Sequence, residues 1–401
     1  MSTQVITKKT ISALRICYFT LSVSVAVYLP RIPDLKDKLH LTVGEIGQIL
    51  MLVGLVGFIA SRLVTLVIKK LTSRRAVLFG VPFMLVGSII IGMTHEVNIF
   101  VGGLIITGFG GFILKTCLYT QSNNVRVMSG NNRVSGFSAI SNAGSLFAIL
   151  IGSIFLSLLS TTTYIISLQI LMSIVFVLVH NHLTKLDIVR GDGDKAEAKL
   201  PWFKKDQSQF WIIVVALFAS TTAEFSVSDW GAILSRDDYQ LRAPYYLLPF
   251  ILFQAGIVVS RFLTNKLSEK YSEINYVRVS AISGSVIWGI AIQVVAHISH
   301  ANHFLVATIV VTSFFIAGCG IGPVWPTMLT SATKSQYPAP VVLARLFSLI
   351  SLAYVFGPGS IGYFAKLTSL SNALMIPIVS LFVVGLLAKR ALVHEKEQVD
   401  H

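Results

Sequence analysis

Charged residues are scarce in this sequence: Asp, Glu, Lys and Arg together make up 12% of its 401 residues. Soluble domains usually contain about 25% charged residues, whereas 54% of this chain is hydrophobic. This composition excludes an ordinary soluble domain. It predicts an all-α polytopic membrane protein in which the lipid bilayer is the main partner.

The sequence also lacks the patterns of disulfides, metal sites and nucleotide-driven enzymes. Its three cysteines, Cys17, Cys117 and Cys319, lie in apolar segments without CxxC or Cys/His spacing. No Walker loop, HExxH or Gly-x-Ser-x-Gly element occurs. We therefore expect no cofactor, no metal and no enzymatic activity.

Acidic residues are fewer than basic ones, 18 against 32, which gives a formal net charge of +14. The Lys and Arg residues gather in short segments between apolar runs, as the positive-inside rule predicts for cytoplasmic loops. No basic helix with interleaved aromatic residues is present, so a nucleic-acid partner is not expected. Counting Lys and Arg in alternate loops places both termini in the cytoplasm.

Hydropathy predicts twelve membrane-spanning helices, since about 20 apolar residues cross a bilayer core. The charge-free segment from Val134 to Val179 is too long for one span and is divided near Ser160. The predicted spans are about 11–30, 46–68, 76–94, 98–124, two within 134–179, 208–232, 244–265, 278–297, 304–329, 343–364 and 370–390.

A polar segment near the middle of the chain divides these spans into two groups of six. The predicted organisation is a six-helix bundle at 1–182, a cytoplasmic linker at 183–207 and a second six-helix bundle at 208–401. Internal similarity supports this division: Gly57 and Arg62 recur as Gly256 and Arg261, 199 positions later. The sequence at 137–143 likewise resembles that at 347–353, with an offset of 210.

Two carboxylates in the seventh span are the leading functional candidates. Glu224 and Asp229 lie inside a long apolar run, where an acidic side chain is costly unless it is paired, solvated or protonated. Both are proton-coupling candidates. The structural alternatives are a permanent ion pair for Glu224 and an outer pair with Arg31 for Asp229.

Further polar and aromatic residues at membrane depth are candidates for contact with a solute. Lys115 can bind an anionic group, neutralise Glu224 or extend its ammonium group to the membrane surface. The amide side chains are candidates for solute contact or for hydrogen bonds between helices, and the tryptophans for stacking on a solute or for an interfacial belt. The predicted substrate-binding residues are Lys115, Asn123, Asn142, Gln254, Trp325 and Trp230.

Five arginines are predicted to have gating or structural roles. Arg62 and Arg261 occupy equivalent positions near the inner ends of spans two and eight, where they can cap facing helix ends. The others are Arg74, Arg75 and, at the outer end of the first span, Arg31.

Twelve spans, the 6+6 repeat and the basic linker together resemble the major facilitator superfamily. Pro30 to Leu35, Gly136 to Gly144 and Glu224 to Trp230 are similar to segments of its YbjJ-like branch, near the sugar permeases. The resemblance implies a monomeric secondary transporter in a bacterial inner membrane, with a small-molecule substrate and protons as coupling ion. A sugar-like or other small hydrophilic compound is the leading substrate class.

Two alternatives remain open from the sequence. A drug or metabolite efflux antiporter is disfavoured because the fifth span lacks the Gly-Pro element of many drug antiporters. A transporter-like sensor or assembly protein is supported by Lys70, which stands where the superfamily usually carries an acid.

Overall fold

The computed structural model describes residues 7–129, 134–184, 208–267, 272–298, 302–333 and 339–391. All regular structure in these ranges is helical, with no strand among them. The all-α fold class predicted from the sequence is therefore confirmed.

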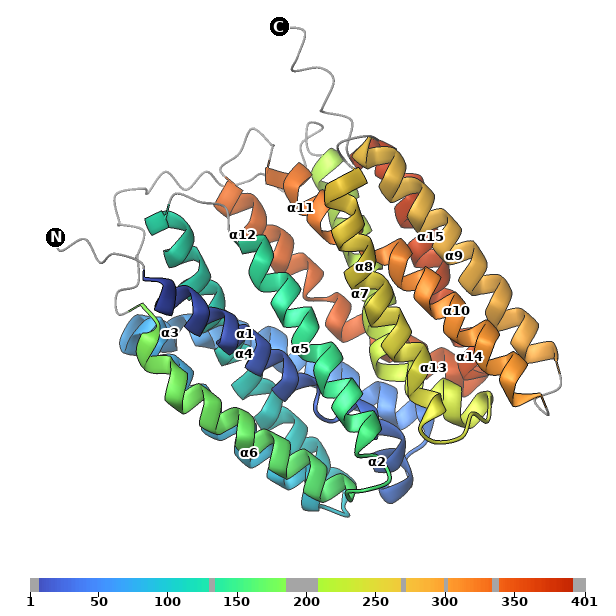
Figure 1. Cartoon of the computed structure of the whole chain (residues 1–401), viewed down its shortest axis with the longest axis horizontal. Helices are drawn as coiled ribbons and strands as arrows, with labels where there is room; N and C mark the ends of the chain where they lie inside the picture. The colour runs from blue at the N-terminus through green and yellow to red at the C-terminus, as the bar shows by residue number, and fades with distance from the viewer. Residues whose placement is uncertain are drawn as a thin grey trace, which may run out of the picture. The chain divides into compact units, whose positions relative to one another are not determined.

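The helices follow one another along the chain and are labelled in Figure 1. The first group is α1 (Lys8–Ala26), η1 (Leu29–Arg31), α2 (Ile32–Lys38), α3 (Val43–Met93), α4 (Val97–Ser129), α5 (Val134–Ile154), α6 (Thr161–Val179) and η2 (His180–His182). The second group is α7 (Ser208–Ile233), η4 (Leu234–Asp238), η5 (Tyr245–Leu247), α8 (Leu248–Leu267), α9 (Glu273–His297), α10 (His303–Ile321), α11 (Val324–Thr333), α12 (Ala339–Ile350), α13 (Ala353–Leu367), α14 (Leu370–Ala373) and α15 (Met375–Ala391).

The described residues contain ten helical segments that are long and apolar enough to cross a membrane, and two shorter apolar ones at Val43–Ile59 and Ile140–Ile154. This is consistent with the twelve predicted spans. Two of them run together as α3, which changes direction at Thr72, where the backbone has φ 64° and ψ 152°. These angles are not helical and are rare for a β-branched residue. Thr72 therefore ends one span and separates it from the next.

The chain forms two compact units. Unit 1 comprises Met1–Leu41 and Leu52–Gly193, and unit 2 comprises Thr42–Met51 and Asp194–His401. The predicted linker at 183–207 lies outside the described residues after Thr184. The predicted domain boundaries therefore stay a prediction.

Within unit 1, α1 packs along α5 and also contacts α4 and α6. Leu14, Met84, Leu114 and Phe176 are among the buried residues of a core to which α1, α3, α4 and α6 all contribute. Within unit 2, α10 packs against α8 and α9, and α15 packs against α7 and α9 (Figure 1). These contacts bury one face of each helix and leave another face apolar and exposed, as lipid requires.

Close glycine contacts recur at corresponding places in the two units. In unit 1, a Cβ added to Gly110 on α4 would lie 2.8 Å from the carbonyl oxygen of Gly80 on α3. In unit 2, a Cβ added to Gly284 on α9 would lie 3.1 Å from the Cα of Gly320 on α10. Such small residues let helix backbones approach closely in a membrane. The helix packing thus repeats as the sequence does.

The connection after the first helix of each unit also repeats in its backbone. His40 in unit 1 and Gln240 in unit 2 both have positive φ, 51° and 53°. Asp34 then accepts a hydrogen bond from Thr161 at the start of α6, while Asp238 accepts two from Ser371 at the start of α14. Each unit therefore uses one acidic residue to hold the start of its last span.

The Gly80–Gly110 contact can be tested with a matched pair of glycines on α4. We expect Gly110→Ala to destabilise the protein by about 1–3 kcal/mol, because the added methyl group overpacks the contact with α3. Gly102 has nothing within 4 Å of an added Cβ, so Gly102→Ala should be neutral or stabilising through helix propensity. Thermal unfolding in detergent measures both. Equal melting temperatures for the two variants would contradict the packing argument.

Candidate functional site

The second half of helix α7 is buried almost all the way round, with one interruption. From Ala219 to Ile233 every residue is buried except Glu224 and Phe225. Next to this interruption, the ring of Phe225 packs edge-on against Tyr354 of α13 at 4.7 Å between centroids. Glu224 is therefore the acidic residue of this stretch that is partly exposed, whereas Asp229 is buried.

Asp229 lies on the same helix in a different environment. Its residue is 7% exposed, and among the described residues it has no hydrogen bond or ion pair. An ionised carboxylate is costly in such a place. Asp229 follows Glu224 by five positions, so the two side chains point about 140° apart around the helix axis. The two carboxylates are thus distinguished by exposure as well as by direction.

The other predicted residues of unit 2 lie on α7, α8 and α11. Trp230 is fully buried, and its indole Nε1 has no hydrogen-bond partner, so the ring is surrounded by protein. Its predicted contact with a solute stays a prediction. Trp325 is half-buried and stacks on Phe347 of α12, with 6.3 Å between ring centroids and 19° between planes. Gln254 is 6% exposed and has no hydrogen bond among the described residues.

Unit 1 contains an aromatic group that the sequence analysis missed. Tyr18 of α1 stacks on Phe137 of α5 at 5.4 Å and packs edge-on against Tyr119 of α4 at 6.3 Å. The Tyr18 hydroxyl donates a hydrogen bond to Ser122. The spacing of residues along α4 could have predicted this group. Lys115, Tyr119 and Ser122 are four and three positions apart, which places them on one face of the helix.

The predicted polar residues of unit 1 lie near this group in sequence. Lys115 is half-buried on α4 with its ammonium group 6.0 Å from the ring centre of Phe112. Asn142 is half-buried on α5, and its amide nitrogen is buried without a hydrogen-bond partner. One residue earlier, Ser141 is hydrogen-bonded to Ser22 of α1. Asn123 lies on α4, but its side chain is outside the described part of the structure.

Comparison with known proteins identifies the fold. The model of the Major Facilitator Superfamily matches residues 14–344, most of the chain. The chain belongs to the major facilitator superfamily. An uncharacterised MFS-type transporter of Yersinia pestis is 21% identical to it over 363 residues, covering 90% of each protein.

Solved structures of a nucleoside transporter have the same architecture. The nucleoside transporter NupG superimposes with a TM-score of 0.70 at 13% identity, covering 97% of this chain and 100% of that one. A mutant form of NupG gives 0.69 at 14% identity, covering 96% and 99%. At these identities the likeness establishes the fold alone. The chain is thus a multi-span membrane protein of a superfamily of transporters.

In this member of the superfamily, Arg31 joins several elements of unit 1. It is 2% exposed, and its guanidinium donates hydrogen bonds to the carbonyls of Phe155 at 2.8 Å, Leu156 at 3.1 Å and Leu159 at 3.1 Å. These carbonyls follow the last residue of α5. Phe155 already accepts a backbone hydrogen bond from Leu159, and Arg31 adds a side-chain donor to all three carbonyls. A cation is also favoured there by the helix dipole.

The carboxylate that Arg31 contacts is Asp34, at 3.3 Å, and its guanidinium also lies 5.0 Å from the ring centre of Tyr164. The sequence analysis considered Asp229 as the partner of Arg31. In the structure, the carboxylate that contacts Arg31 is Asp34 instead. The physical reason is local: Asp34 is three residues away, within reach of a buried guanidinium that must be satisfied in place. A gating role for Arg31 stays a prediction.

The remaining predicted arginines differ in what they contact. Arg261 of α8 donates to the carbonyl of Gly322, just after the end of α10, at 3.2 Å. Arg74 is half-buried and donates to the side-chain oxygen of Asn181 at 2.7 Å, whereas Arg75 is exposed. Arg62 lies within α3, and its side chain is outside the described part.

The role of Arg31 can be tested by its effect on stability. We expect Arg31→Gln to cost about 1–3 kcal/mol, because the carbonyls after α5 lose their buried side-chain donor, while the partly exposed Asp34 keeps contact with water. Arg31→Lys should recover only part of this, since an ammonium group cannot span the same carbonyls. Arg278→Gln, at an exposed position of α9, should stay within about 0.5 kcal/mol of the wild type. Thermal unfolding of the purified variants measures all three, and an unchanged Arg31→Gln would contradict the assignment.

Proposed function

We propose that the protein is a secondary active transporter that moves a small polar solute across the cell membrane by alternating access, coupled to protons. Membership of the superfamily supports transport. The observation that supports the coupling is the interruption in the burial of the second half of α7, where Glu224 is partly exposed inside an apolar span. A carboxyl group at that depth can load and release a proton as the site opens to either side.

Glu224 is proposed as the coupling residue ahead of Asp229. A coupling group must exchange its proton with water on each side in turn, which requires an accessible side chain. Asp229 is only 7% exposed. It remains a second proton-coupling candidate only if the packing of α7 loosens during the cycle.

The proposed solute is a sugar-like compound or another small hydrophilic molecule. Aromatic faces with a few polar groups suit such solutes. In unit 2, Trp325 and Phe347 provide stacked rings, and in unit 1 the amide nitrogen of Asn142 lacks a protein partner. NupG is described as a nucleoside transporter, and nucleosides combine a sugar with a flat ring. We therefore include nucleosides in the proposed class.

The proposed location is a bacterial inner membrane, with both termini in the cytoplasm and the protein acting as a monomer. The distribution of Lys and Arg between loops supports this orientation.

The proposal can be tested in liposomes that contain a pH-sensitive dye, with sugars, nucleosides, amino acids and organic anions as solutes. The wild type should show solute-dependent proton movement. Glu224→Gln should abolish it but retain exchange of labelled for unlabelled solute, because exchange requires binding and reorientation without net proton release. Glu96→Gln, at an exposed position between α3 and α4, and Asp229→Asn should both retain proton movement.

Two results would count against this reading in different ways. Proton movement that is unchanged in Glu224→Gln would remove the coupling role from that residue. Absence of flux for every solute class, with a specific protein partner recovered instead, would favour a sensor over a transporter.

A further inference from the structure

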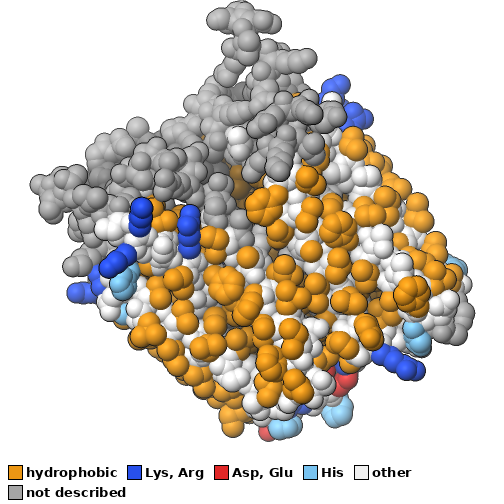
Figure 2. Space-filling model, viewed as in Figure 1, with side chains coloured by type: hydrophobic (Ala, Val, Ile, Leu, Met, Phe, Trp, Pro, Cys, Tyr) orange, Lys and Arg blue, Asp and Glu red, His pale blue; other side chains and the backbone are white. Residues whose placement is uncertain are grey.

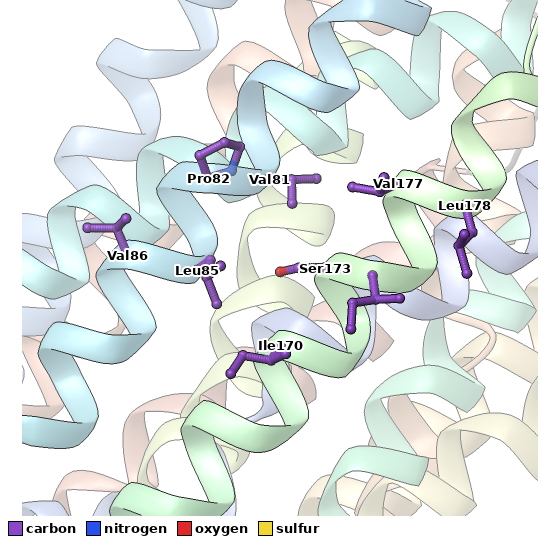
Figure 3. Close-up of a pocket in the computed structure, with 9 residues that line it drawn as sticks. Val81, Pro82, Leu85, Val86, Ile170, Ser173, Val177 and Leu178 are labelled. Carbon is purple, nitrogen blue, oxygen red and sulfur yellow. The ribbon is translucent and has the colours of Figure 1, made fainter.

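The surface of unit 1 carries an apolar groove outside the candidate site. The groove has a volume of about 350 Å³ and runs between α3 and α6. Four residues of α3 between Val81 and Val86 form one wall, and five residues of α6 between Ile170 and Leu178 form the other. Figure 3 shows the two sets of side chains on facing helices.

The groove offers almost no polar group to a ligand. Its one polar side chain is Ser173, whose hydroxyl donates to the carbonyl of Gln169 on its own helix at 2.8 Å. Ile174 is 50% exposed and Val86 is 49% exposed. Both helices are candidate membrane spans, so hydrocarbon is the medium that this groove faces.

The register of α3 places two arginines in line with one wall. Arg74 precedes Val81 by seven residues, and Arg75 precedes Pro82 by seven, a spacing that returns to nearly the same face of a helix. The hydrogen bond from Arg74 to Asn181, which follows α6, shows that the two walls meet at this end. The two arginines therefore lie about two helical turns, roughly 10 Å, beyond the groove, at the end of the span where Lys and Arg are expected to reach the lipid head groups.

Among the residues that the structure describes, no acidic side chain pairs with the positive charge at this end. Neither Arg74 nor Arg75 forms an ion pair with any residue that the structure describes. The segments Leu71–Met93 and Thr161–His182 contain no Asp or Glu. The bond to Asn181 uses one of the five N–H donors of the Arg74 guanidinium. The remaining donors are suited to a phosphate group.

The surface view is consistent with this arrangement. In Figure 2, hydrophobic side chains cover the region over α6, and Lys, Arg and His side chains gather at the end of unit 1 where α1 begins. His180 and His182 lie at that end, directly after α6, and α1 packs against this short segment.

We propose that this groove is a binding site for one anionic phospholipid, with an acyl chain between α3 and α6 and the phosphate group at Arg74 and Arg75. The apolar walls match an acyl chain and the unpaired arginines match an anionic headgroup. Charge complementarity distinguishes this occupant from a second copy of the chain, whose corresponding face carries the same positive charge. The site is independent of the transported solute.

The test is native mass spectrometry of the full chain released from nanodiscs of phosphatidylethanolamine and phosphatidylglycerol. We expect the wild type to retain phosphatidylglycerol about tenfold or more over phosphatidylethanolamine, in line with two arginines near an anionic headgroup. Arg74→Gln/Arg75→Gln should remove the preference. The matched control Lys389→Gln/Arg390→Gln, which neutralises two adjacent exposed basic residues at the end of α15, should keep it.

A second pair of variants tests the apolar part of the site. These variants leave the hydrogen bond from Arg74 to Asn181 intact, whereas Arg74→Gln removes it. Ile174→Trp fills the groove and should lower retention of both lipids, whereas Ile154→Trp, exposed on α5, should not. Melting temperatures confirm that each variant is folded.

Three outcomes would overturn the proposal. The first is equal retention of the two lipids by the wild type. The second is an equal loss of preference in both charge variants, which would indicate a general surface effect. The third is a protein dimer that Ile174→Trp dissociates and Ile154→Trp does not, which would assign the groove to a second copy.

Discussion

A backbone carbonyl or N–H group that lacks a partner inside hydrocarbon costs several kcal/mol, and the ends of the helices show how this chain meets that constraint. Arg31 satisfies the carbonyls that follow α5, and Lys38 donates to the carbonyl of Gly92 in the last turn of α3 at 2.9 Å. Asp34 and Asp238 hold the starts of the last spans. The short η1–α2 segment, which is too polar to span a membrane, is therefore a structural part of unit 1.

The two carboxylates of α7 differ in their exposure to water, a difference that the amino-acid sequence does not show. Both cost free energy in an apolar span, and helix geometry alone separates them only by direction. In the folded protein, Glu224 is partly exposed within the buried second half of α7, while Asp229 is buried. A chemical role that needs exchange with water suits the first position. The second position is better suited to a group that stays neutral.

The spans, their number and the repeat could be predicted from the sequence, because lipid imposes long apolar runs whose ends carry charge or turn residues. The break at Thr72 fell between the predicted spans for that reason. Partners could not be predicted in the same way. Arg31 contacts Asp34 and three carbonyls near the end of α5, and the Tyr18–Phe137 stack joins residues more than a hundred positions apart. Such contacts depend on tertiary packing, which leaves no periodic signal in the chain.

The number of residues between corresponding positions of the two halves changes along the chain. It is 200 positions from His40 to Gln240, 204 from Gly80 to Gly284, and 210 from Gly110 to Gly320 and from Thr161 to Ser371. The spacing rises across the connections before and after the third span of unit 2 and then stays constant. Differences in length between the two halves are therefore tolerated in connections, whereas the thickness of the bilayer fixes the length of a span.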